Sequence, residues 1–406
     1  MKNNKNLVFQ VLEWRPAHKQ VYDDDDPETY LIHLFGRTTD NKTVFVEIDD
    51  FTPYFYVELP QNWKKYHLDI FLEDMKKRVP KKYKNSLIGT KIVYKHKFYG
   101  FNDYKKFNFV RLEFDSHTGF RAYERTIRKK YSNPIISKRS FYPKLYESNI
   151  DPFIRCMHLR NLSACGYIKI KKNAYNVMSK DEENYTSCDI NVATSWRELH
   201  NVEINSIQSF TVASFDIECT SGDGTFPQAS RDDDKVIQIG TTFNRYGEDE
   251  CYYKHIVTLG SCDPIDGVDV ESYDTEEEVL VAWTRMMQKM DPDIVTGYYI
   301  FGFDFKYLKD RSLKLGCSSK FAQLDRMIGE KSEFKEKILQ SAAFGRNELF
   351  YFDMKGRVTV DLLQVMRKDF KFPSYKLDYI AGVFIRGKIS GLTLKKKSVK
   401  SKKYIQ

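Results

Sequence analysis

One nine-residue segment, Thr211–Cys219 (TVASFDIEC), restricts the fold of this chain more than any other. Its apolar residues favour a buried strand. Side chains two positions apart point to the same face of a strand, so Asp216 and Glu218 hold two carboxylates side by side in apolar surroundings. Two neighbouring anions repel each other and resist desolvation. The segment therefore predicts either a strand end open to solvent or a strand that offers its carboxylates to a cation.

The segments after this strand predict an α/β domain. A helix is expected at 276–290, because its apolar residues recur every three or four positions and Thr275 and Glu278 form a capping-box pattern at its start. The predicted order is three strands, a helix, a strand and a helix, at Thr211–Cys219, Val236–Phe243, Cys251–Leu259, Glu276–Met290, Asp293–Tyr298 and Phe303–Leu315. This is the order of the ribonuclease H-like fold, a mixed sheet covered by helices, although many α/β domains share parts of it.

The residues before this domain predict a β-rich unit. Alternating residues favour strands between Leu7 and Leu59 and at Phe107–Phe114, and lysine-rich segments favour helices at 69–84 and 122–131. The polar stretch 181–195 is expected to be a loop, and the run Asp23–Asp26 a solvated loop, since it lacks the ligand spacing of a calcium site. The expected class is α/β (α+β overall), with domains at 1–205 and 206–390 and a lysine-rich tail at 391–406.

Composition narrows the class of protein only slightly. The 406 residues are 41% hydrophobic and 30% charged, which is typical of globular domains, and the net charge of +9 suits a polyanionic partner without requiring one. The seven cysteines form no C-x-x-C pair, so we expect reduced thiols, an intracellular protein and no zinc site. The first ten residues lack the apolar core of a signal peptide, and no run of about 18 apolar residues predicts a membrane span.

A third carboxylate could complete a metal site. Asp304 opens the second predicted helix directly after the strand that ends at Gly297-Tyr298. Two interpretations are open for this acid. It could be there only because the helix dipole favours an acid at a helix start, or it could deliver a third ligand to the sheet edge that carries Asp216 and Glu218. Oxygen ligands suit Mg²⁺ or Mn²⁺, and three carboxylates can hold the two ions used for phosphodiester hydrolysis.

The motifs around these acids resemble those of family B DNA polymerases. The segment Phe215–Glu218 is similar to the first exonuclease motif of that family, and Asp293–Asp304 is similar to the second. Five other segments resemble the delta-type enzymes and those of large DNA viruses, namely 30–37, 51–58, 146–152, 356–363 and 374–378. The resemblance implies an N-terminal domain followed by a 3′→5′ exonuclease domain that proofreads DNA with two Mg²⁺ or Mn²⁺ ions. It implies Asp216, Glu218 and Asp304 as catalytic metal ligands, and Tyr298, Tyr299 and Phe303 as residues that contact DNA.

The sequence departs from that family at two points. Tyr299 stands where the family usually has an asparagine that seats the primer end, so we expect altered, weakened proofreading. The third exonuclease motif, Tyr-x-x-x-Asp, is expected near residue 420, whereas the sequence ends at Gln406. Asp378 has the wrong spacing to replace it, and Asp361 is expected to be structural, at a helix start. The polymerase motifs of the palm are also absent, so this chain alone is expected to cleave DNA slowly or not at all and not to polymerise it.

Three functions remain open at this stage. The first is the N-terminal and exonuclease part of a replicative DNA polymerase, with single-stranded primer ends, template and the rest of the polymerase as partners. The second is a catalytically inactive DNA-binding module, and the third is a free-standing ribonuclease H-like nuclease, which would need a complete acidic cluster. Clamps and accessory subunits are left undetermined. So is the choice between nucleus and host cytoplasm.

Overall fold

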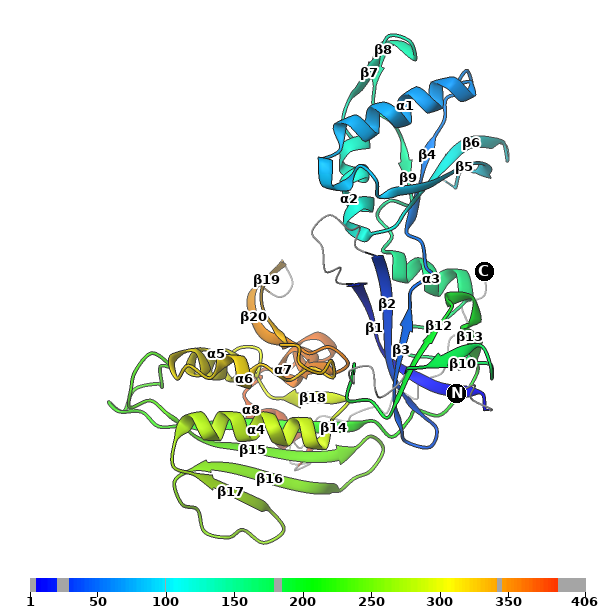
Figure 1. Cartoon of the computed structure of the whole chain (residues 1–406). Coiled ribbons are helices and arrows are strands. Elements are labelled where there is room, and N and C mark those ends of the chain that lie inside the picture. The colour runs from blue at the N-terminus through cyan, green and yellow to red at the C-terminus, as the bar shows by residue number, and fades with distance from the viewer. Residues whose placement is uncertain (1–4, 20–28, 99, 179–184, 342–344, 386–406) are drawn as a thin grey trace.

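A seven-stranded sheet forms the first body of the chain (Figure 1). The computed structural model describes residues 5–19, 29–98, 100–178, 185–341 and 345–385. The strand order is β11-β12-β3-β2-β1-β10-β13, and all described pairs except β12 with β3 are antiparallel. Its elements are β1 Leu7–Lys19, β2 Thr29–Thr38, β3 Thr43–Ile48, α3 Pro152–Arg160, β10 Tyr167–Ile170, β11 Tyr175–Val177, β12 Ile190–Thr194, the 3₁₀ turn Trp196–Glu198 and β13 His200–Val202.

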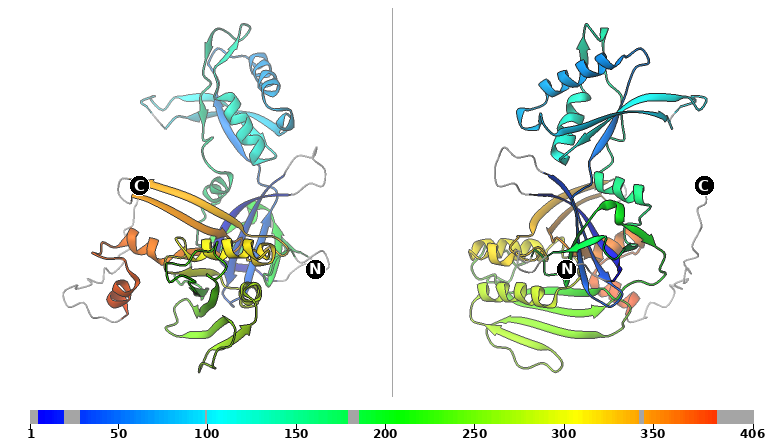
Figure 2. Two further views of the ribbon diagram at one scale, coloured as in Figure 1. Left: turned by 90° about the vertical axis from the view of Figure 1, so that its left-hand side faces the viewer. Right: turned by 45° about the vertical axis from the view of Figure 1, so that its right-hand side comes forward.

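Residues 54–146 form a second body with a core of its own, which stands apart from the rest in both views of Figure 2. A four-stranded sheet of order β5-β6-β4-β9 buries one face against two helices. The elements are β4 Tyr54–Glu58, α1 Lys65–Arg78, the 3₁₀ turn Lys81–Tyr83, β5 Leu87–His96, β6 Lys106–Phe114, α2 His117–Ile127, β7 Tyr131–Asn133, β8 Ser137–Phe141 and β9 Leu145–Tyr146.

Both helices of this second body begin earlier than the sequence predicted. The helix expected at 69–84 runs from Lys65 to Arg78 and is followed by Pro80, which breaks it. The helix expected at 122–131 runs from His117 to Ile127, because the Ser116 hydroxyl caps it by accepting the Gly119 N–H at 3.2 Å. The predicted helix bounds were therefore wrong by several residues.

The third body contains a six-stranded mixed sheet of order β17-β16-β15-β14-β18-β21. Only β15 runs against the others, and the helix α4 packs across β15, β16 and β17. The elements are β14 Thr211–Cys219, β15 Val236–Arg245, β16 Cys251–Leu259, β17 Asp269–Tyr273, α4 Glu276–Met290, β18 Ile294–Gly297, α5 Asp304–Lys314, α6 Ser318–Phe321, β19 Glu333–Ser341, β20 Gly345–Asp353, β21 Val358–Asp361, α7 Leu362–Asp369 and α8 Leu377–Phe384. The β19–β20 hairpin projects from this body beside the first sheet (Figure 2).

The predicted fold class is confirmed, and the strands β14 and β16 and the helix α4 have the predicted bounds. Five neighbouring strands, β16-β15-β14-β18-β21 with β15 reversed, have the ribonuclease H-like arrangement that the element order indicated. The order of three strands before the helix was wrong, since the short strand β17 follows β16. The predicted division of the chain near residue 205 stays a prediction.

The loop predicted at 181–195 was also wrong in part, because Ile190–Thr194 forms β12. This strand pairs in parallel with β3, which lies far earlier in the sequence, and antiparallel with β11. The run Asp23–Asp26 and the lysine-rich tail lie outside the described residues. Within the described ranges, no helix is both long and apolar enough to cross a membrane.

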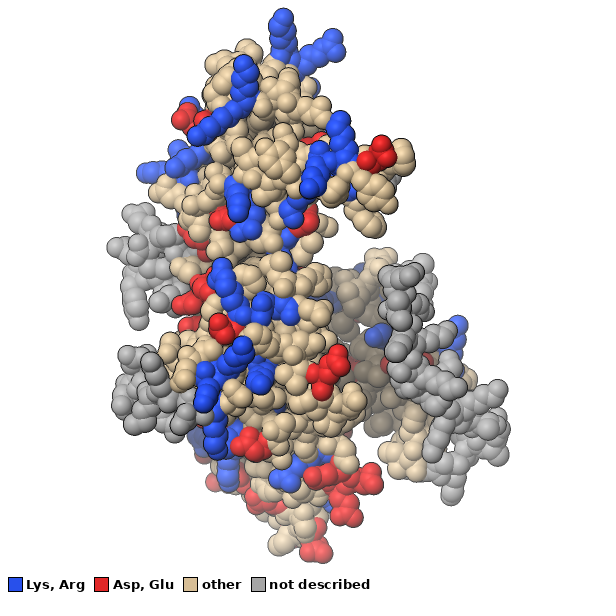
Figure 3. Space-filling model, turned by 90° about the vertical axis from the view of Figure 1, so that its right-hand side faces the viewer, with Lys and Arg blue, Asp and Glu red and all other residues tan. Residues whose placement is uncertain are grey.

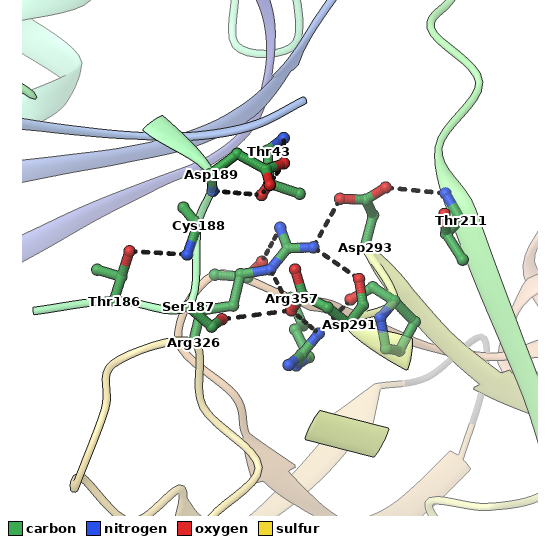
Figure 4. A network of polar contacts seen from close by, with 12 residues as sticks. Thr43, Thr186, Ser187, Cys188, Asp189, Thr211, Asp291, Asp293, Arg326 and Arg357 are labelled. Carbon is green, nitrogen blue, oxygen red and sulfur yellow. Dashed lines mark hydrogen bonds and ion pairs between the residues drawn. The ribbon is translucent and has the colours of Figure 1, made fainter. Parts of the chain in front are cut away.

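A buried network of ion pairs joins the seven-stranded sheet of the first body to the six-stranded sheet of the third body, called the first and third sheets below. Asp293 is fully buried and accepts hydrogen bonds from Arg37 Nε of β2 at 2.8 Å and from Arg326 Nη2 at 2.9 Å. Figure 4 shows Arg326 and Arg357 around Asp291, with the segment Thr186–Asp189 alongside. Despite burial, the two guanidinium groups lower the pKa of Asp291. Removing one partner of such a network leaves a buried charge unpaired, so breaking this contact between the two sheets is costly.

The same network holds the starts of the two central strands of the third sheet. Asp293 directly precedes β18, and its carboxylate also accepts the N–H of Thr211, the first residue of β14, at 2.8 Å. With about 3.3 Å per residue, Asp216 lies about 16 Å along β14 from this clamp. The far ends of β14 and β18 carry the candidate site.

Candidate active site

Three parallel strands end at one edge of the third sheet. In the pairing register, Thr296 of β18 lies beside Ser214 of β14, and Gly297 lies beside Asp361 of β21. Asp216, the turn after Gly297 and Asp361 are therefore neighbours, although they lie up to 145 residues apart in the sequence. Ligands of open α/β sheets bind at the carboxyl ends of such strands.

A tight turn brings Asp304 over the end of β14. The N–H groups of Gly302 and Phe303 donate to the carbonyl of Tyr299 at 2.9 and 3.1 Å, and α5 then begins at Asp304. Gly297 is required at the start of the turn, since a Cβ there would lie 2.6 Å from the carbonyl oxygen of Phe215. The close approach of the two strands thus depends on glycine at position 297.

Asp304 and Asp216 form a coupled pair of carboxyl groups. Asp304 is 3% exposed, and its side chain shares a hydrogen bond with that of Asp216. Burial, followed by the charge of Asp216, raises the pKa of Asp304 to about 7. Burial also raises the pKa of Asp216, although the hydrogen bond with Asp304 acts to lower it. Paired carboxyls with displaced pKa values are typical of sites that bind cations or transfer protons.

Glu218 lies on the same face of β14 as Asp216, as the alternation predicted. Burial alternates along β14, and both carboxylates are on its exposed face. Glu218 does not, however, join Asp216 and Asp304 in a tight trio. Within the described ranges, only one group of three potential metal ligands (histidine, cysteine or acidic residues) has its ligand atoms within 4.8 Å of one another. That group lies elsewhere, on β16 and β17.

The pair Asp216 and Asp304 fits a divalent cation. One oxygen of Asp304, Oδ1, is buried and has no hydrogen-bond partner. An unpaired buried carboxylate oxygen beside a second carboxylate costs free energy that a cation removes. Oxygen donors of this kind suit Mg²⁺ or Mn²⁺.

Asp361 organises the turn between Gly297 and Asp304. Its Oδ1 accepts the N–H groups of Tyr299 at 2.9 Å and Leu363 at 2.8 Å, and its Oδ2 accepts the N–H of Phe301 at 3.0 Å. The predicted helix-start role is confirmed, because Asp361 caps α7. The hydrogen bonds from the amides of residues 299 and 301 to Asp361 were not predicted, because they arise only from the pairing of β18 with β21. Asp378 lies exposed in the first turn of α8.

Tyr299 adopts a left-handed backbone conformation with φ of 68°. Asparagine tolerates this conformation far better than tyrosine does. Tyr299 is 48% exposed, and its ring lies against Gly302, where an added Cβ would be 2.0 Å from a ring carbon. Glycine at 302 is therefore needed for this ring position.

The other two residues expected to contact DNA lie on either side of the turn. The hydroxyl of Tyr298 donates to the carbonyl of Tyr375 before α8. The rings of Phe303 and Phe226 pack edge to face, with centroids 5.1 Å apart. Phe226 is 71% exposed and lies in the polar loop after β14, so sequence pattern gave no reason to select it.

A buried ion pair supports the helix that carries Asp304. Arg311 of α5 binds Glu276 at the start of α4 and donates to the carbonyls of Ala229 and Arg231. These contacts fix α5 against both α4 and the loop that bears Phe226. The position of Asp304 is thus set by the core and not by the turn alone.

Comparison with known proteins places these features in one family. A model of the exonuclease domain of DNA polymerase family B matches residues 143–380, more than half of the chain. The DNA polymerase of Acanthamoeba polyphaga mimivirus is 36% identical over 350 residues, covering 84% of this chain and 20% of that protein. The DNA polymerase delta catalytic subunit of Drosophila melanogaster is 30% identical over 370 residues, covering 88% of this chain and 33% of that protein.

A solved structure shares the fold. The family B DNA polymerase from the hyperthermophilic archaeon Pyrobaculum calidifontis matches with a TM-score of 0.60 at 17% identity, over 93% of this chain and 39% of that one. This chain therefore spans between a fifth and two fifths of the length of the proteins named here.

Proposed function

The chain belongs to the family B DNA polymerases, and from this premise we propose that it is the N-terminal and proofreading portion of a DNA-directed DNA polymerase that hydrolyses the 3′ end of DNA. The observation that carries the proposal is the coupled pair Asp216 and Asp304 at the strand ends, with the unpartnered Oδ1 of Asp304. Single-stranded primer ends and template are the proposed partners, at an intracellular site in the nucleus or host cytoplasm.

In the proposed reaction, Asp216, Glu218 and Asp304 would hold the divalent cations. Bound Mg²⁺ or Mn²⁺ supplies a water of lowered pKa and stabilisation of the leaving 3′ oxygen. The buried position of Asp304 keeps its carboxylate fixed, and the exposed face of Asp216 and Glu218 leaves room for the phosphodiester. Because burial and the charge of Asp216 raise the pKa of Asp304, this pair would release a proton on binding a cation.

Aromatic residues beside these acids are proposed to seat the last bases of the strand. Tyr299 and Phe226 are exposed, and Phe303 packs on Phe226. Stacking on aromatic rings tolerates every base, as proofreading requires. On the face drawn in Figure 3, lysine and arginine side chains gather over the upper and middle parts of the molecule, where a phosphate backbone would be attracted.

A DNA-binding module without catalysis is the second candidate. It is favoured by one observation, namely that Glu218 does not come within 4.8 Å of both Asp216 and Asp304. Digestion of a 5′-labelled single strand with Mg²⁺ separates the two. We expect slow shortening from the 3′ end by the chain, and none by the variant Asp216→Ala/Glu218→Ala.

A matched control uses two exposed acids of the same sheet. Asp249 and Glu250 lie in the turn between β15 and β16, so Asp249→Asn/Glu250→Gln should cleave like the unchanged chain. If the chain and both variants bind the strand equally and none cleaves it, the binding module is the better description. If Asp216→Ala/Glu218→Ala cleaves as fast as the chain, the assignment of these acids is wrong.

A further inference from the structure

A second cluster of potential metal ligands lies at the free edge of the same sheet. His255 of β16 pairs in register with Asp269 of β17, and Glu271 follows on the same face. One ligand atom from each of the three lies within 4.8 Å of the others. The edge strand β17 is hydrogen-bonded to the sheet on one side only, through β16.

His255 has no hydrogen-bond partner in this cluster. The residue is 2% exposed, and neither ring nitrogen makes a hydrogen bond. Its Nε2 lies 3.2 Å from Oε1 of Glu271. A buried imidazole without hydrogen-bond partners is costly, and a metal ion bound to a ring nitrogen would remove that cost.

The two carboxylates are already oriented by tyrosines. The Tyr253 hydroxyl donates to Oδ2 of Asp269 at 2.7 Å, and the Tyr273 hydroxyl donates to Oε2 of Glu271 at 2.9 Å. Each carboxylate keeps its second oxygen for another partner. Hydrogen bonds of this kind, made to the ligand and not to the metal, fix ligand orientation in metal sites.

The surroundings of the cluster are strongly acidic. The segment 260–275 contains five aspartate or glutamate residues and no lysine or arginine. In the described part of the chain, no lysine or arginine forms an ion pair with Asp269 or Glu271. Arg285 of α4 interacts electrostatically with the adjacent Tyr273. Figure 3 shows acidic side chains gathered at the lower end, where Figure 1 places β16 and β17. This local charge favours a cation.

We propose that His255, Asp269 and Glu271 bind a transition metal of the Zn²⁺ type that ties β17 to β16. An imidazole together with carboxylates suits Zn²⁺, whereas Mg²⁺ prefers oxygen ligands alone. Asp269 and Glu271 reach solvent, which leaves the fourth position to water. The prediction of no zinc site rested on cysteine spacing, and this cluster uses no cysteine.

Zinc binding is best measured in the Asp216→Ala/Glu218→Ala protein, because the candidate active site could also take up Zn²⁺. After dialysis against Zn²⁺ in slight excess, we expect about one tightly held ion per chain and a higher thermal unfolding temperature than in EDTA. His255→Gln in this background should lose the ion and the thermal shift. Tyr253→Phe should weaken binding roughly tenfold, as loss of an orienting hydrogen bond does.

Two further variants keep the result decisive. His96→Gln changes an exposed histidine of β5 and should bind like the parent. Asp269→Asn alters an exposed side chain, so it should also lose the ion even if His255→Gln does not fold. Co²⁺ in place of Zn²⁺ should give visible absorption bands that both ligand variants lack. No Zn²⁺ bound by the parent, or equal Zn²⁺ in the parent and in Asp269→Asn and His255→Gln, would overturn the proposal.

Discussion

Replacing Asp361 by asparagine changes one oxygen to an amide group and tests how the active-site turn is held. Asparagine can still accept the N–H groups of Tyr299 and Leu363 through its single oxygen. Its NH₂ group would then face the N–H of Phe301, a donor that the carboxylate accepts at 3.0 Å. Two donors cannot bond to each other, so the Phe301 amide loses its partner.

The structure sets the size of this effect. Each hydrogen bond to a charged acceptor contributes about 1.5–3 kcal/mol, and part of that is offset because burial of the carboxylate is itself unfavourable. Burial indeed raises the pKa of Asp361 in spite of the three amides. We therefore expect local destabilisation of about 2 kcal/mol for Asp361→Asn and about 4 kcal/mol for Asp361→Ala.

Hydrogen exchange of individual amides gives the sharpest measurement. Since 1.4 kcal/mol corresponds to a factor of ten, the Phe301 amide should exchange about 30-fold faster in Asp361→Asn. Tyr299 and Leu363 should keep most of their protection in that variant and lose it in Asp361→Ala. Asp378→Asn, an exposed acid at the start of the next helix, should change none of the three. Equal loss at all three amides in Asp361→Asn, or none at Phe301, would refute the reasoning.

Three other outcomes are expected. Tyr299→Asn should raise the free energy of unfolding by about 0.5–1 kcal/mol, because φ of 68° suits asparagine, and should increase digestion of single-stranded DNA; unchanged unfolding and slower digestion would contradict it. In EDTA, the folded protein keeps the Asp304 proton up to about pH 7, whereas an unfolded aspartate loses it near 3.8. The free energy of unfolding should therefore fall as pH rises through this window, and urea titrations of Asp304→Asn should lack that slope. Arg37→Met should cost about 3 kcal/mol in urea unfolding by leaving Asp293 short of a partner, and a cost below about 1 kcal/mol would contradict a buried clamp.

Much of the third body could be predicted from sequence because its signals are local. Helix α4 has its capping box and its apolar stripe within 16 residues, and the Thr275 hydroxyl accepts the Glu278 N–H as that pattern predicts. Strand β14 alternates between buried and exposed residues, which is why Asp216 and Glu218 were placed on one face. The short strands β12 and β17 were missed, since each is defined by pairing with a partner and not by its own pattern.

The sequence alone determined the family, the fold class and the identity of the candidate acids, because motifs and periodicity are properties of neighbouring residues. Only the tertiary structure decided which acids meet. Strand pairing across 62 residues puts Asp361 beneath the turn at 299–301, and the same sheet brings Asp304 to Asp216 while Glu218 stays further away. Pairing at the opposite edge assembles His255 with Asp269 and Glu271. Burial then sets the pKa of Asp304, a property that depends on the whole folded core.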